Sequence, residues 1–250
     1  MTEPDGDFSA QADAYARSRP GYPVDLIERL SRDVEVSSED PVLDLGAGTG
    51  MLTSTLTDLG FAVTALEPNA SMRALAVGGD AEWIDGTFES TGLAPDAFAW
   101  AVAAQAFHWA DPRRALPEVR RVLRPGGALT LLWNNRLNDD HPVVAWTREA
   151  IARHVPDFSH AYRDEDWGAL LTSTGDFDDV HEHQQRHVVP MGRARFFDLW
   201  RSHHRLNRIA GPDRFGRFLA ALDGHLDEEA VETVDVPYLC RSWTARRAGR

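Results

Sequence analysis

Cysteine, lysine and long apolar runs are scarce or missing in this chain of 250 residues. The single cysteine, Cys240, excludes an internal disulfide framework and a cysteine-rich zinc site, and it fits a reducing cytoplasm. No apolar run approaches the roughly 18 residues that a membrane-spanning helix requires. Residues 1–7 are acidic and lack the apolar segment of a secretory signal. We therefore expect a cytoplasmic protein that does not engage a membrane.

Basic residues are fewer than acidic ones, and all of them are arginines. The 26 basic residues are outnumbered by 39 acidic ones, so the formal net charge is −13 at pH 7. An acidic chain repels phosphate backbones and loses the main energy of general nucleic-acid binding. Hydrophobic residues make up 43% of the chain, which is typical of a folded globular protein. The composition favours a small molecule over a nucleic acid as partner.

Residues 41–136 alternate between short apolar runs and helical segments. Strands are expected at 41–46, 61–66, 81–85, 97–104 and 128–133, and helices at 51–59, 69–77 and 112–123, with a turn at 124–127. Strands separated by helices form parallel sheets with right-handed crossovers. The pattern predicts an α/β fold with a doubly wound, Rossmann-like, mostly parallel sheet and helices on both faces.

The pattern changes after Trp133. Helices are expected at 141–154, 164–171, 193–205 and 212–222, and strands at 177–189 and 231–245, the last interrupted near Pro237. Two terminal strands would complete a seven-stranded sheet, and the inserted helices would form a cap. No linker rich in Pro, Gly or Ser divides the chain, so we expect one domain over residues 1–250. Its parts would be a core at 41–136, a helical cap with one sheet strand at about 141–222, and a terminal strand at 231–245.

Three glycines, at positions 46, 48 and 50, follow the first predicted strand. Glycine lets the backbone turn sharply from strand to helix and approach a ligand closely. Glu67 ends the second strand, 21 residues after Gly46, where a carboxylate can accept both hydroxyls of a ribose. The alternative without a ligand is a tight turn followed by a surface glutamate.

The glycine spacing and a nearby acid discriminate between nucleotide-like ligands. A dinucleotide-binding loop has the spacing G-x-G-x-x-G, whereas position 51 is Met51 and the spacing here is G-x-G-x-G. Asp44 precedes the loop, and its charge favours a cation, such as the amino or sulfonium group of S-adenosylmethionine, over a pyrophosphate. An NAD(P)-dependent oxidoreductase is an alternative that Met51 opposes. A non-catalytic or repurposed S-adenosylmethionine-binding protein is a second alternative, because binding motifs and turnover are separable.

Several motifs carry a resemblance to a known family. Residues 42–50, Val-Leu-Asp-Leu-Gly-Ala-Gly-Thr-Gly, resemble motif I of class I S-adenosylmethionine-dependent methyltransferases. Residues 65–69 and 121–127 are similar to later family motifs. Residues 15–23 and 104–109 resemble a narrower subgroup that includes the trans-aconitate and cantharidin small-molecule methyltransferases. The resemblance covers about residues 8–136 well and continues weakly beyond.

The resemblance implies a cofactor site for S-adenosylmethionine and a small-molecule acceptor. The N-terminal segment 1–40 would cover the cofactor, with Tyr15 and Arg19 on the methionine carboxylate. The other implied cofactor contacts are Asp44, Gly46, Ala47, Gly48, Glu67, Pro68, Met72, Thr87, Phe88, Glu89, Gln105 and Ala106. The resemblance favours O-methylation, of a carboxylate or a hydroxyl in secondary metabolism.

The chemistry follows from the sulfonium, which is already activated. The enzyme has to align the acceptor and exclude water, and it needs a base only where the acceptor must lose a proton. His108 follows Gln105 closely and is the candidate base, with packing in the cleft floor as its alternative. The indole ring of Trp109 would offer its π face to the sulfonium.

Acceptor contacts are expected from residues beyond the glycine loop: Trp109, Trp133, Arg136 and His203. The tryptophans at positions 146, 167, 200 and 243 are interpreted as core. Three histidines, at 181, 183 and 187, share one face of a predicted strand, but no carboxylate with ligand spacing joins them. We expect no metal site.

Overall fold

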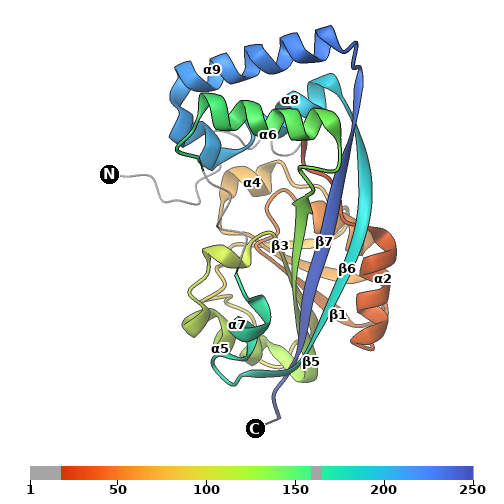
Figure 1. The fold of residues 1–250 in the computed structure, drawn as a ribbon. Helices are drawn as coiled ribbons and strands as arrows, with labels where there is room; N and C mark the ends of the chain where they lie inside the picture. The colour runs from red at the N-terminus through yellow and green to blue at the C-terminus, as the bar shows by residue number, and fades with distance from the viewer. Residues whose placement is uncertain (1–17, 159–164, 250) are drawn as a thin grey trace.

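A computed structural model describes residues 18–158 and 165–249, and it contains one seven-stranded sheet (Figure 1). The strand order is β3-β2-β1-β4-β5-β7-β6. β1 to β5 are parallel, and β7 runs antiparallel to both β5 and β6. The strands are β1 (Pro41–Leu45), β2 (Ala62–Leu66), β3 (Glu82–Ile84), β4 (Phe98–Ala104), β5 (Leu123–Arg136), β6 (Phe177–Gly192) and β7 (Thr233–Arg247). The predicted fold class is confirmed.

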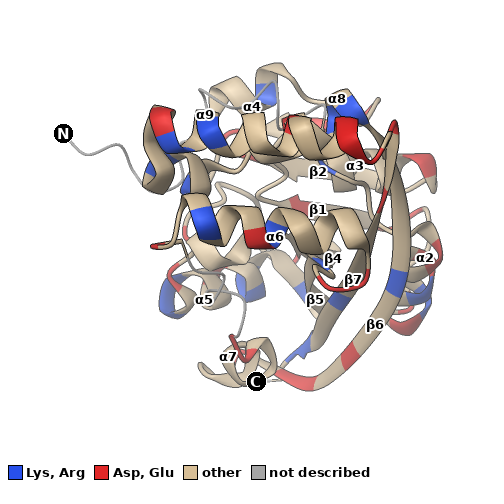
Figure 2. Cartoon of the chain, turned by 45° about the horizontal axis from the view of Figure 1, so that its top comes forward, with Lys and Arg blue, Asp and Glu red and all other residues tan. Residues whose placement is uncertain are grey.

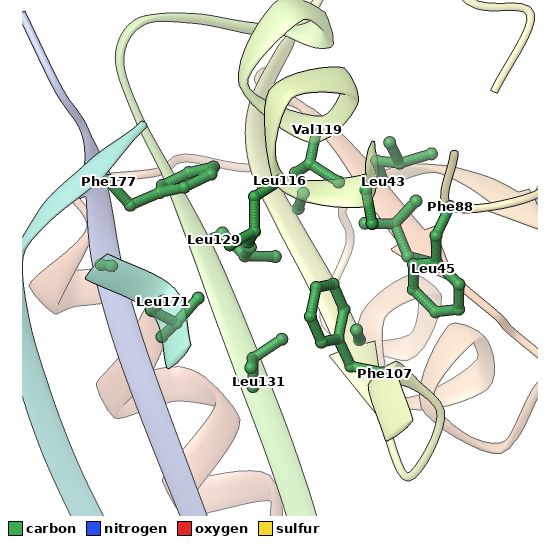
Figure 3. Packing of buried hydrophobic residues seen from close by; sticks show 14 of the residues in the cluster. Leu43, Leu45, Phe88, Phe107, Leu116, Val119, Leu129, Leu131, Leu171 and Phe177 are labelled. Carbon is green, nitrogen blue, oxygen red and sulfur yellow. The ribbon is translucent and has the colours of Figure 1, made fainter. Parts of the chain in front are cut away.

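Helices cover both faces of the sheet because its central strands are apolar on both sides. In β4 only the last residue, Ala104, is not buried. One face packs against α2 (Val24–Asp33) and α3 (Met51–Asp58), and the other against α5 (Pro112–Val122) and α7 (Trp167–Thr172). Figure 3 shows the second face, where side chains of α5 and α7 meet those of β1 and β5. α2 was not expected from the sequence.

Three helices form a cap above the sheet: α6 (Pro142–His154), α8 (Arg193–Arg201) and α9 (His204–Glu228). They enclose a separate apolar core with the ends of β6 and β7. In Figure 1 this cap lies beyond the carboxyl end of β5, on the same side of the sheet as α4 (Ala70–Ala74), which follows β2. α9 contains a kink at Gly211, where φ is 65°. The cap therefore lies on the side of the parallel strands where ligands of such sheets bind.

α7 does not join the cap, although the sequence places a helix at 164–171 within it. Trp167 stacks on Trp133 with ring centres 3.9 Å apart, and Leu171 is fully buried in the sheet core. The predicted strand 177–189 extends to Gly192 and reaches from this region up to the cap (Figure 1). The inserted segment thus covers the sheet face around Trp133 and also the carboxyl ends of the parallel strands.

One predicted interruption of a strand is wrong, and one predicted turn lies inside a strand. Residues 124–127, the expected turn, form an irregularity within β5 between Leu123 and Ala128, which both pair with β4. β7 continues through Pro237, whose carbonyl accepts a hydrogen bond of 2.9 Å from Leu137 N. The ladder with β5 ends at the next residue, so the missing N–H of the proline costs no ladder hydrogen bond.

Acidic and basic residues alternate along the helices in Figure 2, with no helix that is basic throughout in that view. Within the described residues, no helix is long and apolar enough to cross a membrane.

Candidate functional site

The glycine loop turns β1 into α3 and is held by backbone hydrogen bonds to β2. Gly46 N and Ala47 N both donate to Leu66 O, at 2.8 and 3.0 Å. Gly46, Gly48 and Gly50 have φ values of 68°, 59° and 85°, a region that side chains with a Cβ rarely adopt. The predicted glycine turn is therefore present at the carboxyl end of β1, below the cap.

Two of these glycines have opposite surroundings. A Cβ on Gly46 would lie 2.7 Å from the Cβ of Ala106 and 3.0 Å from the ring of Phe88. Among residues 18–158 and 165–249, a Cβ on Gly48 would meet nothing within 4 Å. Gly46 therefore serves close packing between the loop and the end of β4, whereas Gly48 borders open space that a ligand can use.

Alanine substitutions separate these two roles. We expect the Tm of Gly46→Ala to be well below that of Gly48→Ala. In both variants the left-handed backbone strain of the alanine lowers the free energy of unfolding by about 1 kcal/mol. Only in Gly46→Ala does the new Cβ also overlap with neighbouring side chains. Gly48→Ala should weaken S-adenosylhomocysteine binding by about tenfold or more, since its Cβ enters the open space. Gly92→Ala, with φ 72° and nothing within 4 Å, is the control for strain alone. Unfolding and calorimetry measure both effects; wild-type affinity in Gly48→Ala would contradict this role.

Glu67 closes the glycine loop from the end of β2. Its side chain is buried, with Oε2 accepting from Gly48 N at 2.9 Å and Oε1 from Asn69 N at 2.8 Å. Burial raises the pKa of Glu67 above its usual value, and these two backbone donors oppose the rise. Each carboxylate oxygen keeps a further lone pair that can accept a hydroxyl hydrogen. The backbone amides of Gly48 and Asn69 thus fix the position of the Glu67 carboxylate.

Asp44 lies at the end of β1 beneath the same loop. It is 1% exposed, and its Oδ2 accepts from Thr53 Oγ1 at 2.6 Å. Among residues 18–158 and 165–249, its Oδ1 has no hydrogen-bond partner, and neither has the buried hydroxyl of Thr49. Burial raises the pKa of Asp44 to about 7, and the nearby charge of Glu67 adds to the rise. A buried acid with an unsatisfied oxygen is suited to a cation or an N–H donor.

The residues of this site fit S-adenosylmethionine. The open space at Gly48, the acceptor pair of Glu67 and the unsatisfied oxygen of Asp44 suit a ribose and an ammonium group. Met72 is buried beside this region in α4, and the exposed Pro68 follows Glu67 directly.

The end of β4 supplies a second wall. Gln105 has a left-handed φ of 56°, which is strained for a residue with a side chain. Its Nε2 donates to Asn134 O at 2.9 Å, and Asn134 Nδ2 donates to Gly21 O at 3.2 Å. The ends of β4 and β5 are thereby joined to the segment before α2. Gln105 and the buried Ala106, both implied cofactor contacts, directly follow the end of β4.

The implied cofactor contacts after β3, Thr87, Phe88 and Glu89, also have structural roles. Phe88 lies in the sheet core, with its ring 5.4 Å from that of Phe107 in an edge-to-face arrangement. Glu89 accepts a hydrogen bond of 2.8 Å from Asp111 N, at the start of α5. Thr87 forms a bridge with Ser90. Packing and helix capping account for the positions of Phe88 and Glu89, and a contact of either residue with the cofactor stays a prediction.

The N-terminal contacts are described in part. Tyr15 lies outside the described residues. The carbonyl of Arg19 accepts from Arg195 Nη2 at 3.3 Å, and Ser18 Oγ donates to Ser202 Oγ at 3.2 Å. This strap, residues 18–21, therefore runs between the cap helix α8 and the end of β5.

His108 and Trp109 belong to the short helix η2 (Phe107–Trp109) after β4. Both side chains are exposed, and their ring centres are 4.5 Å apart. Desolvation lowers the pKa of His108 to about 4. His108 is consequently neutral at pH 7.

Three of the residues expected to contact the acceptor lie in different parts of the structure. Trp133 is a core residue between Trp167 and Trp243, because it lies on the sheet face that α7 covers. His203 caps α9, with Nδ1 accepting from Leu206 N at 3.3 Å. Arg136 alone lies under the cap, with its guanidinium carbon 4.2 Å from the ring centre of Trp200. The prediction that Trp133 contacts the acceptor is therefore wrong.

The three strand histidines have separate partners. His181 pairs with Asp179 at 3.1 Å, His183 with Asp33 at 2.9 Å, and His187 Nε2 lies 2.8 Å from Asn134 Oδ1. In the part of the chain that the structure describes, no group of three or more His, Cys, Asp or Glu side chains could hold a metal ion.

Comparisons with known proteins agree with this geometry. A methyltransferase domain family matches residues 43–131. An uncharacterized methyltransferase of Mycobacterium tuberculosis is 41% identical over 144 residues, which are 57% of this chain and 56% of that protein. An uncharacterized methyltransferase of Geobacillus kaustophilus is 31% identical over 61% of this chain and 76% of its own length.

Solved structures share the fold. A structure from Anabaena variabilis has a TM-score of 0.62 at 17% identity, covering 91% of this chain and 98% of that one. Haemonchus contortus phosphoethanolamine N-methyltransferase 2, in complex with S-adenosyl-L-methionine, has a TM-score of 0.52 at 14% identity, covering 97% of this chain and 57% of that one. The matched region spans little more than half the length of the mycobacterial relatives. From the site and these matches, the chain belongs to the S-adenosylmethionine-dependent methyltransferase family.

Proposed function

We propose that this protein transfers the methyl group of S-adenosylmethionine to an oxygen atom of a small-molecule acceptor. The observation that carries the proposal is the arrangement of Asp44, Gly48 and Glu67 at one edge of the sheet. A buried acid, an open glycine and a carboxylate held by loop amides meet there, at the carboxyl ends of β1 and β2. The resemblance to the trans-aconitate and cantharidin subgroup supports oxygen as the acceptor atom.

When bound, S-adenosylmethionine supplies a methyl group that the sulfonium has already activated. The chain has to hold the cofactor, align the acceptor and exclude water. Glu67 would accept hydrogen bonds from the ribose hydroxyls of the cofactor. Asp44 would accept a hydrogen bond from its ammonium group. Gln105 lies at the end of β4, beside the region proposed for methyl transfer. Its hydrogen bond to Asn134 holds its side chain in place there.

The cap and the strap are suited to excluding water. Ser18 and Arg19 connect residues 18–21 to α8, and Asn134 connects them to β5. An acceptor between these parts would be enclosed by the apolar core of the cap on one side. We propose that the cap, rather than the glycine loop, selects the acceptor.

His108 contributes little as a base in this proposal. A group with a pKa of about 4 accepts a proton poorly from an alcohol or a phenol. We propose that His108 donates a hydrogen bond from its ring N–H to the acceptor, and that the reacting oxygen is ionised before it binds, as a carboxylate is. Turnover in His108→Gln close to that of the wild type would support this assignment.

Ligand binding and turnover test the function. We expect S-adenosylhomocysteine at 100 times its Kd to stabilise the protein by about 2.7 kcal/mol, a Tm rise of roughly 5–10 °C for a chain of this size. NAD should produce no rise. Formation of S-adenosylhomocysteine with a panel of small acids and phenols then separates an enzyme from a non-catalytic binding protein. Stabilisation by NAD alone would overturn the proposal.

A further inference from the structure

Asn134, near the carboxyl end of β5, makes hydrogen bonds to three separate parts of the chain. Its backbone carbonyl accepts from Gln105 Nε2 at 2.9 Å, and its Nδ2 donates to Gly21 O at 3.2 Å. Its Oδ1 lies 2.8 Å from Nε2 of His187, on the edge strand β6. Only 7% of Asn134 is exposed. One buried residue thus connects the end of β4, the strap and the edge of the sheet.

The chemistry of the groups fixes the direction of the hydrogen bonds around Asn134. A backbone carbonyl can only accept, so the amide nitrogen of Asn134 has to face Gly21 and its oxygen has to face His187. An amide oxygen can also only accept, so His187 has to donate from Nε2. Burial lowers the pKa of His187, so its ring is neutral at pH 7 and carries a single hydrogen. With that hydrogen on Nε2, the ring selects one orientation of the Asn134 amide.

The hydrogen bond from His187 to Asn134 crosses the strand that lies between β5 and β6. That strand is β7, and its residue opposite Asn134 is Cys240. Its residue opposite His187 is Tyr238, with ring centres 5.5 Å apart. Residues opposite each other in a ladder lie on the same face of the sheet. The short side chain of Cys240 suits a contact that passes over it.

Asn134 is also connected to the glycine loop, through the end of β4. Gln105, which donates to the carbonyl of Asn134, is followed by Ala106. A Cβ on Gly46 would lie 2.7 Å from the Cβ of Ala106, so the glycine loop packs closely there. The position of Asn134 therefore bears on the wall of the cofactor site as well as on the strap.

The strap, residues 18–21, has hydrogen bonds to the cap and to the sheet. Ser18 and the carbonyl of Arg19 bond to side chains of α8 and of the residue that follows it. Gly21 O accepts from Asn134, on the sheet. Without the bond from Asn134, the strap would keep its bonds to the cap region and lose this bond to the sheet.

We propose that His187 is a positioning residue of the cofactor site: its Nε2–H orients the Asn134 amide, and the amide holds the strap against the sheet. This inference rests on the proposed methyl transfer, in which the strap helps to enclose the site. A strap that is held before the ligand arrives needs less ordering when the ligand binds. Loss of the His187 donor should therefore act mainly on the dissociation of the ligand.

Substitutions at His187 test the proposal through the binding of S-adenosylhomocysteine. His187→Leu should raise the Kd about three- to tenfold, mostly through faster dissociation in stopped-flow measurements. His187→Gln keeps a side-chain donor, so its Kd should stay within about twofold of the wild type. The matched control is His183→Leu, on the same strand, which removes a pair with Asp33 and should leave the Kd unchanged.

A double-mutant cycle separates a positioning role from a merely structural one. Asn134→Ala should weaken binding at least as much as His187→Leu does, because it removes the bond to Gly21 outright. Adding His187→Leu to Asn134→Ala should change the Kd no further, since His187 acts through the amide. Independent, additive effects of the two substitutions would overturn the role of His187.

Two measurements on the ligand-free protein separate this inference from the proposed function. NMR of the ring nitrogens in the wild type at pH 7 should show the His187 hydrogen on Nε2; a hydrogen on Nδ1 would overturn the proposal, even where a variant fails to fold. Hydrogen exchange in peptides that cover residues 18–26 should be faster in His187→Leu and unchanged in His187→Gln. Wild-type protein that binds no S-adenosylhomocysteine would overturn the proposed function. Normal binding, with unchanged exchange and dissociation in His187→Leu, would overturn this inference alone.

Discussion

Glu67→Ala is expected to weaken S-adenosylhomocysteine binding by about 100-fold. The variant loses the charge-assisted hydrogen bonds to two ribose hydroxyls, each of order 1.5–3 kcal/mol, and about 3 kcal/mol corresponds to two decades in Kd. It also leaves the amides of Gly48 and Asn69 without their acceptor, so the loop that faces the ligand is less ordered. Calorimetry of the purified variant measures the change directly.

Glu118→Ala is the matched control for the loss of a partly buried carboxylate. Glu118 accepts from Thr91 and pairs with Arg121 at 2.7 Å, and these bonds hold its pKa at about 2. This variant should lose stability in thermal unfolding and keep its Kd within about a factor of three, below 1 kcal/mol. Similar affinities for Glu67→Ala and Glu118→Ala would remove the ribose contact from Glu67.

The cofactor half of the site could be predicted because its signals are local in sequence. Gly46, Gly48 and Glu67 lie at strand ends that the apolar pattern defines, and the parallel order of β1 and β2 brings those ends together. The strand and helix alternation also predicts the sheet itself. Local patterns did not reveal how tightly Gly46 packs on Ala106, because that contact joins two separate loops.

The acceptor half could not be predicted to the same extent, for a geometric reason. Trp133 and Arg136 leave the same strand, but successive side chains of a strand point to opposite faces, so both could not line one pocket. Which face α7 covers depends on the packing of its own Trp167 on Trp133, a residue that also contacts Trp243 and lies far from both in sequence. Trp200 has a core pattern in sequence, and only the fold shows that its N–H has no partner among residues 18–158 and 165–249.

Asp44 should make the ligand-free protein less stable as the pH rises. Its folded pKa, about 7, is above the unfolded value of 3.8, so the folded state holds more protons between these values. Stability is therefore fully present below about pH 4 and is lost as the pH rises through about 7. At about 1.36 kcal/mol for each pKa unit, the loss is of order 4 kcal/mol, an upper bound. The raised pKa of Glu67 acts in the same direction.

Asp44→Asn isolates this contribution because asparagine does not titrate. Between pH 4 and 8, denaturant unfolding should show a fall in stability for the wild type that is largely absent in the variant. Asp40→Asn is the opposite control: hydrogen bonds from Ser37 lower the pKa of Asp40, so its contribution is lost at acidic pH. Identical pH slopes for wild type and Asp44→Asn would place the pKa of Asp44 in its ordinary range.

The same carboxyl should make ligand affinity depend on pH with the opposite sign. An ammonium group beside Asp44 favours the ionised acid, so binding below pH 7 has to release a proton. The affinity for S-adenosylhomocysteine should therefore rise by up to about tenfold per pH unit below pH 7 and level off above it. Asp44→Asn should bind more weakly and with little pH dependence, because its amide cannot gain charge. Parallel affinity profiles for the two proteins from pH 5.5 to about 7.5, below the usual pKa of an α-amino group, would exclude Asp44 from contact with the ammonium group.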